Sequence, residues 1–196
     1  MPDFEGKDNY LNTNICYFII MAKVYRVENI VASISLRTFI PLKKLKTFPD
    51  TQYNPEQFPG LVFRMKDMHI TFLVFGSGKL VCTGSRSREA IDTALKILIG
   101  KLKKIGVTIK EKPKIDIQNI VASGNLNRVL DLNKIAYSVD NTEYNPEQFP
   151  GLVYKLADSR ITFLLFGTGK IVCTGAKKVS EIDDAIDSLL NIINTK

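Results

Sequence analysis

The chain has 196 residues, of which 45% are hydrophobic, enough for one large domain or two small ones with a sizeable core. Its longest early apolar run, residues 15–22, is far shorter than the ~20 residues that cross a bilayer, and it lacks the flanks of a secretory signal. These features exclude a membrane-spanning or exported protein of the usual kind, and we expect an intracellular one.

The formal net charge of +7 is unevenly distributed along the chain. Residues 22–112 contain 17 Lys and Arg against 7 Asp and Glu, a net charge of +10, whereas residues 1–21 carry −2 and residues 113–196 carry −1. A basic half favours a polyanionic partner, although a solvated lysine-rich helix face would produce the same charge.

Residues 1–22 have no counterpart later in the chain, and we expect them to form a weakly ordered extension. The remainder divides into two repeats, which we place at residues 23–112 and 113–196. One ten-residue segment, Tyr-Asn-Pro-Glu-Gln-Phe-Pro-Gly-Leu-Val, occurs unchanged at Tyr53–Val62 and at Tyr144–Val153. In both copies its Phe is followed 17 residues later by a second Phe, which pairs Phe58 with Phe75 and Phe149 with Phe166.

The first repeat is predicted to contain a strand, a short helix, a three-stranded meander and a long amphipathic helix. In chain order these are strand 25–33, helix 41–48, strands 60–66, 70–75 and 79–84, and helix 87–105. Ser87 can cap the long helix and Gly106 can end it.

The second repeat has matching elements, including a strand at 118–123, a helix at 130–137 and a long helix at 180–193. Between the repeats, residues 107–112 and 114–118 read as two strands joined by a tight bend at Pro113. Because no Gly/Ser-rich linker separates the halves, we expect them to share one continuous sheet. Cys82 and Cys173 lie at matching places in the repeats, which indicates buried structural thiols and not a disulfide or metal site.

The strands carry apolar residues on both faces, whereas two helices per repeat can cover only one face. If Phe72 and Val74 face the helices, the opposite face is left with an apolar set in each repeat: Val31, Leu73, Phe75 and Val81, and Val121, Leu164, Phe166 and Val172. A contiguous apolar patch of this size indicates a binding surface, unless residues 1–22 cover it.

Polar residues on that face are also duplicated. They comprise a central group, Asn29, Thr83, Asn119 and Thr174, and a rim of cations, Arg64, Lys79, Lys155 and Lys170. An apolar floor with central polar groups and peripheral cations suits a DNA minor groove, which offers base acceptors, apolar sugar walls and flanking phosphates.

These motifs resemble the TATA-box-binding protein family, especially its archaeal type, over residues 25–193. The resemblance is carried by both copies of Asn-Ile-Val-Ala-Ser, of the ten-residue segment, and of Gly-(Ser/Thr)-Gly-Lys-(Leu/Ile)-Val-Cys-Thr-Gly. It implies an α+β fold, a pseudo-twofold saddle in which a curved ten-stranded antiparallel sheet has four helices on its convex face and DNA under its concave face.

The resemblance also implies roles for individual residues. The two Phe pairs would kink DNA, and the rim cations would contact phosphates. The centre of the site would be formed by Asn29, Asn119, Thr83 and Thr174. Val31, Leu73, Val81, Val121, Leu164 and Val172 would pack in the groove. Glu147 and Gln148 would contact transcription factor B, and the assembly would include RNA polymerase.

The resemblance implies no cofactor and no enzymatic activity, and it places the protein in the cytoplasm at the nucleoid if archaeal, or in the nucleus if eukaryotic. The residues themselves offer little for catalysis: His69 lies at an expected hairpin tip, and Gly76-Ser77-Gly78-Lys79 lacks the spacing of a phosphate-binding loop. A duplicated scaffold that binds a lipid or a partner protein remains the alternative. The apolar face also favours weak self-association of the free protein.

Overall fold

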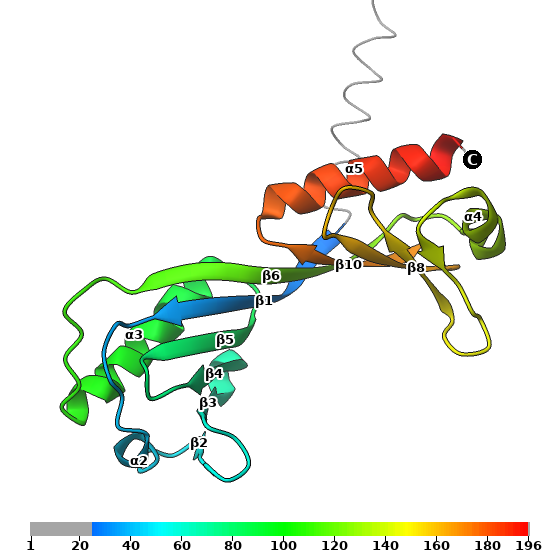
Figure 1. Ribbon diagram of the computed structural model, residues 1–196. Helices are drawn as coiled ribbons and strands as arrows, with labels where there is room; N and C mark the ends of the chain where they lie inside the picture. Colours follow the sequence, from blue (N-terminus) through cyan, green and yellow to red (C-terminus); the bar gives the residue numbers. More distant parts are fainter. Residues whose placement is uncertain (1–24, 196) are drawn as a thin grey trace, which may run out of the picture.

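The computed structural model describes residues 25–195, which form one ten-stranded antiparallel sheet with helices on one side (Figure 1). The strand order is β2-β3-β4-β5-β1-β6-β10-β9-β8-β7. In the first half the strands are β1 (Tyr25–Ser35), β2 (Thr51–Gln52), β3 (Leu61–Met65), β4 (Ile70–Val74) and β5 (Lys79–Ser85). In the second half they are β6 (Lys114–Asn125), β7 (Thr142–Glu143), β8 (Gly151–Lys155), β9 (Thr162–Phe166) and β10 (Lys170–Ala176).

The strand order reads the same from either edge once each strand is replaced by its counterpart in the other repeat. The two long strands β1 and β6 pair at the centre, from Tyr25 opposite Gly124 to Ser35 opposite Lys114. This confirms the expected saddle with pseudo-twofold symmetry, and it confirms that the halves share one sheet.

Four helices cover one face: α2 (Leu42–Leu45), α3 (Arg88–Lys104), α4 (Leu132–Ser138) and α5 (Val179–Thr195). Figure 1 shows α5 above the strands of the second repeat. It also shows two end loops, residues 53–60 and 144–150, which extend from the two ends of the sheet. The helices define the convex side, so the opposite face is the concave one.

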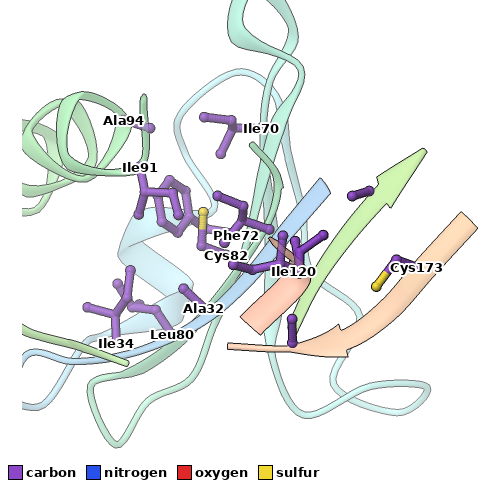
Figure 2. Close-up of a cluster of buried hydrophobic side chains, with 14 of the residues drawn as sticks. Ala32, Ile34, Ile70, Phe72, Leu80, Cys82, Ile91, Ala94, Ile120 and Cys173 are labelled. Carbon is purple, nitrogen blue, oxygen red and sulfur yellow. The ribbon is translucent and has the colours of Figure 1, made fainter. Parts of the chain in front are cut away.

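Alternation along the strands determines which side chains meet the helices. In β4, Ile70, Phe72 and Val74 are buried, whereas Thr71 and Leu73 between them are half-buried on the other face. Figure 2 shows Ile91 and Ala94 of α3 beside Phe72 and Cys82. Phe72 is therefore covered by a helix, as expected, while Leu73 is not.

The long helix α3 begins as the sequence predicts. Ser87 has an extended backbone, and its hydroxyl accepts a hydrogen bond from the Ala90 N–H at 3.1 Å. This capping bond satisfies one of the N–H groups that lack an intrahelical partner. Ile91, Ala94, Leu95, Leu98 and Leu102 form its buried face.

Three expectations about elements are wrong or incomplete. Residues 107–112 form no strand, and residues 114–123 belong to the single strand β6, not to two. Helix α2 spans only four residues and starts after Pro41. The turn expected at Asp67–His69 contains a short 3₁₀ helix (Lys66–Met68), after which His69 adopts a left-handed backbone with φ 55°.

The fifth strand of the first half is the short β2, which pairs with β3 at one edge of the sheet. The fifth strand of the second half is the short β7, which pairs with β8 at the other edge. Residues 1–22, expected to form a weakly ordered extension, and Cys16 lie outside the described residues. None of the helices described in residues 25–195 is both long and apolar enough to cross a membrane.

Candidate nucleic-acid interface

The centre of the concave face is built by the β1–β6 pair. Asn29 lies opposite Val121, and Val31 lies opposite Asn119. Since paired residues of antiparallel strands project to the same face, the two Asn and two Val alternate in a diagonal arrangement about the pseudo-twofold axis. The structure thus brings these four predicted site residues together.

Each central Asn is held by an adjacent strand. The Gly84 N–H donates to Asn29 Oδ1 at 2.7 Å, and Asn29 Nδ2 lies 3.3 Å from Thr83 Oγ1. Gly84 has φ 93°, and a Cβ built there would lie 2.1 Å from the His69 carbonyl oxygen, so glycine is required at this position.

The second repeat reproduces this arrangement. The Gly175 N–H donates to Asn119 Oδ1 at 2.8 Å, and Asn119 Nδ2 donates to Thr174 Oγ1 at 3.1 Å. In both repeats the backbone N–H holds the amide oxygen, and the amide NH₂ retains one hydrogen beyond its threonine contact. The centre of the face therefore offers hydrogen-bond donors.

An apolar row runs outward from this centre in each half. Val62, Leu73 and Val81 are successive cross-strand neighbours in the first half, and Val153, Leu164 and Val172 in the second. All six are half-buried. Val62 and Val153 were not predicted, although they end the duplicated segment and stand two residues before Arg64 and Lys155, a spacing that places them on the same face.

An aromatic pair closes each row. The ring centroids of Phe58 and Phe75 are 5.7 Å apart, and those of Phe149 and Phe166 are 5.9 Å apart, both in edge-to-face geometry. Phe149 is 41% exposed, which is high for a large apolar side chain packed against another.

Glycine at the start of the neighbouring strand makes room for each pair. A Cβ at Gly60 would lie 2.7 Å from Phe58 Cε1, and one at Gly151 would lie 2.6 Å from Phe149 Cε1. Any larger residue would displace the rings. The duplicated segment therefore supplies both a Phe and the space in which it stands.

The four predicted rim cations are exposed. Lys79 and Lys170 begin β5 and β10, while Arg64 and Lys155 lie on β3 and β8. Lys155 already forms an ion pair, because its Nζ lies 2.7 Å from Glu143 Oε1.

Two hollows of about 480 and 610 Å³ lie at symmetry-related positions beside Phe75 and Phe166. The first is lined by Ser33, Val81, Lys79 and Asp116, and the second by Ser123, Val172, Lys170 and Arg26. The matching positions 26 and 116 thus differ in charge. Glu28 lies next to the second hollow, where hydrogen bonds from Ser123 and Arg26 hold the pKa of its carboxyl below the ordinary value.

The uneven charge of the chain lies mainly on the convex helices. α3 carries five basic and two acidic residues, whereas α5 carries four acidic residues and no basic one: Glu181, Asp183, Asp184 and Asp187. The basic first half is therefore a property of the helical side as much as of the concave face.

The described residues offer little for catalysis or metal binding. Residues 25–195 contain no group of three or more His, Cys, Asp or Glu arranged to hold a metal ion. Cys82 and Cys173 are buried and unpaired, and burial raises the pKa of both thiols to about 12. This confirms the prediction of buried structural thiols.

Glu147 and Gln148 are exposed in the second end loop, beyond the concave face. Asn145 shapes this loop, since its side-chain oxygen accepts from the Glu147 N–H at 3.2 Å and its carbonyl accepts from the Gln148 N–H at 3.1 Å. The loop thus presents both side chains to solvent.

Comparison with known proteins places this surface in context. The family model for transcription factor TFIID, or TATA-binding protein, matches residues 24–105 and again 114–196. TATA-box-binding proteins of Methanosphaera stadtmanae and Pyrococcus abyssi are each 48% identical to the chain, over 87% and 84% of its length and 91% and 87% of theirs. The solved structure of the Methanococcus jannaschii TBP aligns with a TM-score of 0.80 and 40% identity, covering 88% of this chain and 99% of that one.

Proposed function

The chain belongs to the transcription factor TFIID (TATA-binding protein) family of non-enzymatic DNA-binding proteins, and we propose that its concave face binds the minor groove of TATA-box promoter DNA. As a member of that family it is a general transcription factor of initiation. The remaining question is how these particular residues perform the task.

The duplicated Asn amides are the observation that carries the proposal. Their oxygens accept from Gly84 and Gly175, so the groups offered to a ligand are N–H donors. In the minor groove, A·T and T·A pairs present only acceptors, whereas a G·C pair adds the donor N2–H₂ of guanine. Two fixed donors on an apolar floor therefore favour A·T pairs at the centre of the site.

The aromatic pairs are proposed to act as wedges at the two ends of the contact. Phe58 with Phe75, and Phe149 with Phe166, stand where the sheet ends, and insertion between base pairs would kink the duplex there. Pyrimidine–purine steps such as TA are the easiest to open, so they are the preferred insertion points. Specificity then arises with few base hydrogen bonds.

The groove-packing residues are proposed to be Val31, Leu73, Val81, Val121, Leu164 and Val172, with Val62 and Val153 added by their place in the same rows. Thr83 and Thr174 support the central amides. Phosphate contacts are assigned to Arg64, Lys79, Lys155 and Lys170.

We further propose that the DNA-bound protein recruits transcription factor B through the second end loop, with Glu147 and Gln148 at the contact, and so nucleates assembly with RNA polymerase. The exposure of both side chains supports this role. The repeats, residues 23–112 and 113–196, are the proposed functional units. Because the matched relatives are archaeal, we propose a place at the nucleoid in the cytoplasm.

A binding titration tests the proposal. The protein should bind a duplex with a TATA-like element more tightly than a GC-rich duplex of equal length. If only the four rim cations neutralise phosphates, the slope of log K against log salt concentration should be about −3 to −4. Adding transcription factor B should give a larger complex on the TATA duplex, and replacing Glu147 and Gln148 with Ala should weaken it. Equal affinity for both duplexes would refute the proposal and favour a scaffold that binds other ligands.

A further inference from the structure

The two ends of the concave face differ at one pair of equivalent positions on the edge strands. Glu143 of β7 corresponds to Gln52 of β2, by the same spacing that relates Lys155 to Arg64. Glu143 binds Lys155 at 2.7 Å, whereas the uncharged Gln52 cannot form an ion pair with Arg64. The second repeat thus holds a carboxylate against one of the cations assigned to phosphate contact.

This ion pair faces the surface assigned to DNA. Glu143 lies opposite Val153, and Lys155 lies opposite Thr162, so both belong to the concave side of their strands. Their side chains are 69% and 60% exposed, so water and an incoming phosphate can reach the pair. The hydrogen bond from Lys155 lowers the pKa of the Glu143 carboxyl, which therefore stays ionised at neutral pH.

The first repeat has an acidic residue near its edge as well, but its partner is different. Asp50 binds Lys66 Nζ at 2.9 Å, and Lys66 is not among the rim cations. The second repeat has Asn141 and Ala157 at these two positions, so this pair has no equivalent there. Within residues 25–195, no ion pair involves the Arg64 side chain, whereas Lys155 is already paired with a carboxylate that a phosphate would have to displace.

We propose that Glu143 competes with the DNA backbone for Lys155 and makes the second-repeat end of the concave face the weaker phosphate anchor. A phosphate that approaches Lys155 must displace the carboxylate or accept its repulsion. A nearly symmetric surface thereby gains a stronger end and a weaker end, which is what a protein needs to distinguish the two directions along its site. This inference rests on the proposed function and assigns to Glu143 a role in tuning it.

The test is a set of charge-matched variants measured on one TATA duplex over a range of salt concentrations. Glu143→Gln should tighten binding by about 1.4- to fivefold at low salt, since an exposed ion pair is weak and is screened by salt. The salt slope should become more negative by at most about 0.9, the value for one full phosphate contact, because Lys155 already makes a weakened contact in the parent. Gln52→Glu should weaken binding and make the slope shallower, because it places a carboxylate within reach of Arg64.

Asp184→Asn is the control, because it removes the same charge from the exposed convex helix α5. It should leave the slope unchanged. The double variant Gln52→Glu with Glu143→Gln restores the total charge and should return the affinity to near that of the parent. TATA binding by the parent with identical curves for Glu143→Gln and Asp184→Asn would overturn this inference alone. Absence of TATA preference in the parent would overturn the proposed function and this inference with it.

Discussion

The role proposed for Asn29 and Asn119 depends on the orientation of a single amide group in each residue. A backbone N–H from the neighbouring strand holds the side-chain oxygen, at 2.7 Å in one repeat and 2.8 Å in the other. A half-buried amide that is fixed in this way presents its donor without the entropic cost of orienting it on binding. The fold therefore determines the polarity of the group that the concave face would offer to DNA under the proposed function.

Replacing both residues with aspartate separates binding from folding. In Asn29→Asp/Asn119→Asp, one carboxylate oxygen can still accept from Gly84 or Gly175, so the free energy of unfolding should change by about 1 kcal/mol or less per site. The second oxygen replaces the donor with a negative charge. Affinity for the TATA duplex should fall by about tenfold or more, because a correct base contact is worth ~1–3 kcal/mol.

Fluorescence anisotropy with the TATA duplex measures this loss, and urea denaturation measures the stability. Asn133→Asp, on the exposed surface of α4, adds negative charge away from the concave face and should bind almost normally. Normal TATA binding by the double aspartate variant would exclude the assigned role of the amides.

At the scale of elements, α3 depends on a cap that is visible in the sequence. Ser87→Ala removes the acceptor of the Ala90 N–H and should reduce the free energy of unfolding by about 1 kcal/mol. Gly100→Ala in the same helix should raise it by about 0.5–1 kcal/mol, since a Cβ there meets no atom within 4 Å and alanine favours the helix.

Urea denaturation of Ser87→Ala and Gly100→Ala measures whether the free energy of unfolding falls in the first variant and rises in the second. Neither position touches the concave face, so TATA affinity should stay constant in both. Equal midpoints for Ser87→Ala and the parent would show that the cap contributes nothing measurable to α3.

The incorrectly predicted strand at residues 107–112 is explained by packing. Val107 is buried and Ile109 packs partly against the core, so the segment alternates as a strand does. Yet β1 already lies between β5 and β6, and β6 already lies between β1 and β10. No free edge remains beside them, and the segment crosses as a loop.

At the scale of the whole molecule, the two Phe pairs at opposite ends of one sheet are the proposed wedges that would bend a duplex between them. Burying a Phe is worth roughly 1.5–3 kcal/mol, so each pair offers about 3–6. This matches the few kcal/mol needed to unstack a base step, a cost described for minor-groove binders that include this family. The affinity must then come from the apolar rows and the cations.

Removing one wedge should reduce the bend more than it reduces stability. Phe149 is 41% exposed, so Phe149→Ala/Phe166→Ala should cost less than the ~3–5 kcal/mol per residue typical of buried Phe. Energy transfer between dyes on the two ends of a bound duplex should decrease. Tyr137→Ala, at a site 97% exposed on α4, serves as the control. An unchanged bend in the double variant would disprove the wedge role.

The sequence alone determined the duplication, the long helices, the shared sheet and the apolar concave face. These follow from repeat spacing and from periods of 3.6 and 2, which are local properties. Strand alternation also placed most of the residues assigned to DNA on one face, and the family resemblance supplied the roles proposed for them. The two-residue strands β2 and β7 are too short to show a period.

Only the tertiary structure decided which groups meet across the strands. Asn29 bonds Gly84, 55 positions away, and Glu143 binds Lys155 across a loop and a strand pair. Such partners depend on register and bulges, which no local pattern reports. For that reason the sequence indicates the face proposed to bind DNA, while the structure shows the orientation of its amide donors and the ion pair that distinguishes one of its ends.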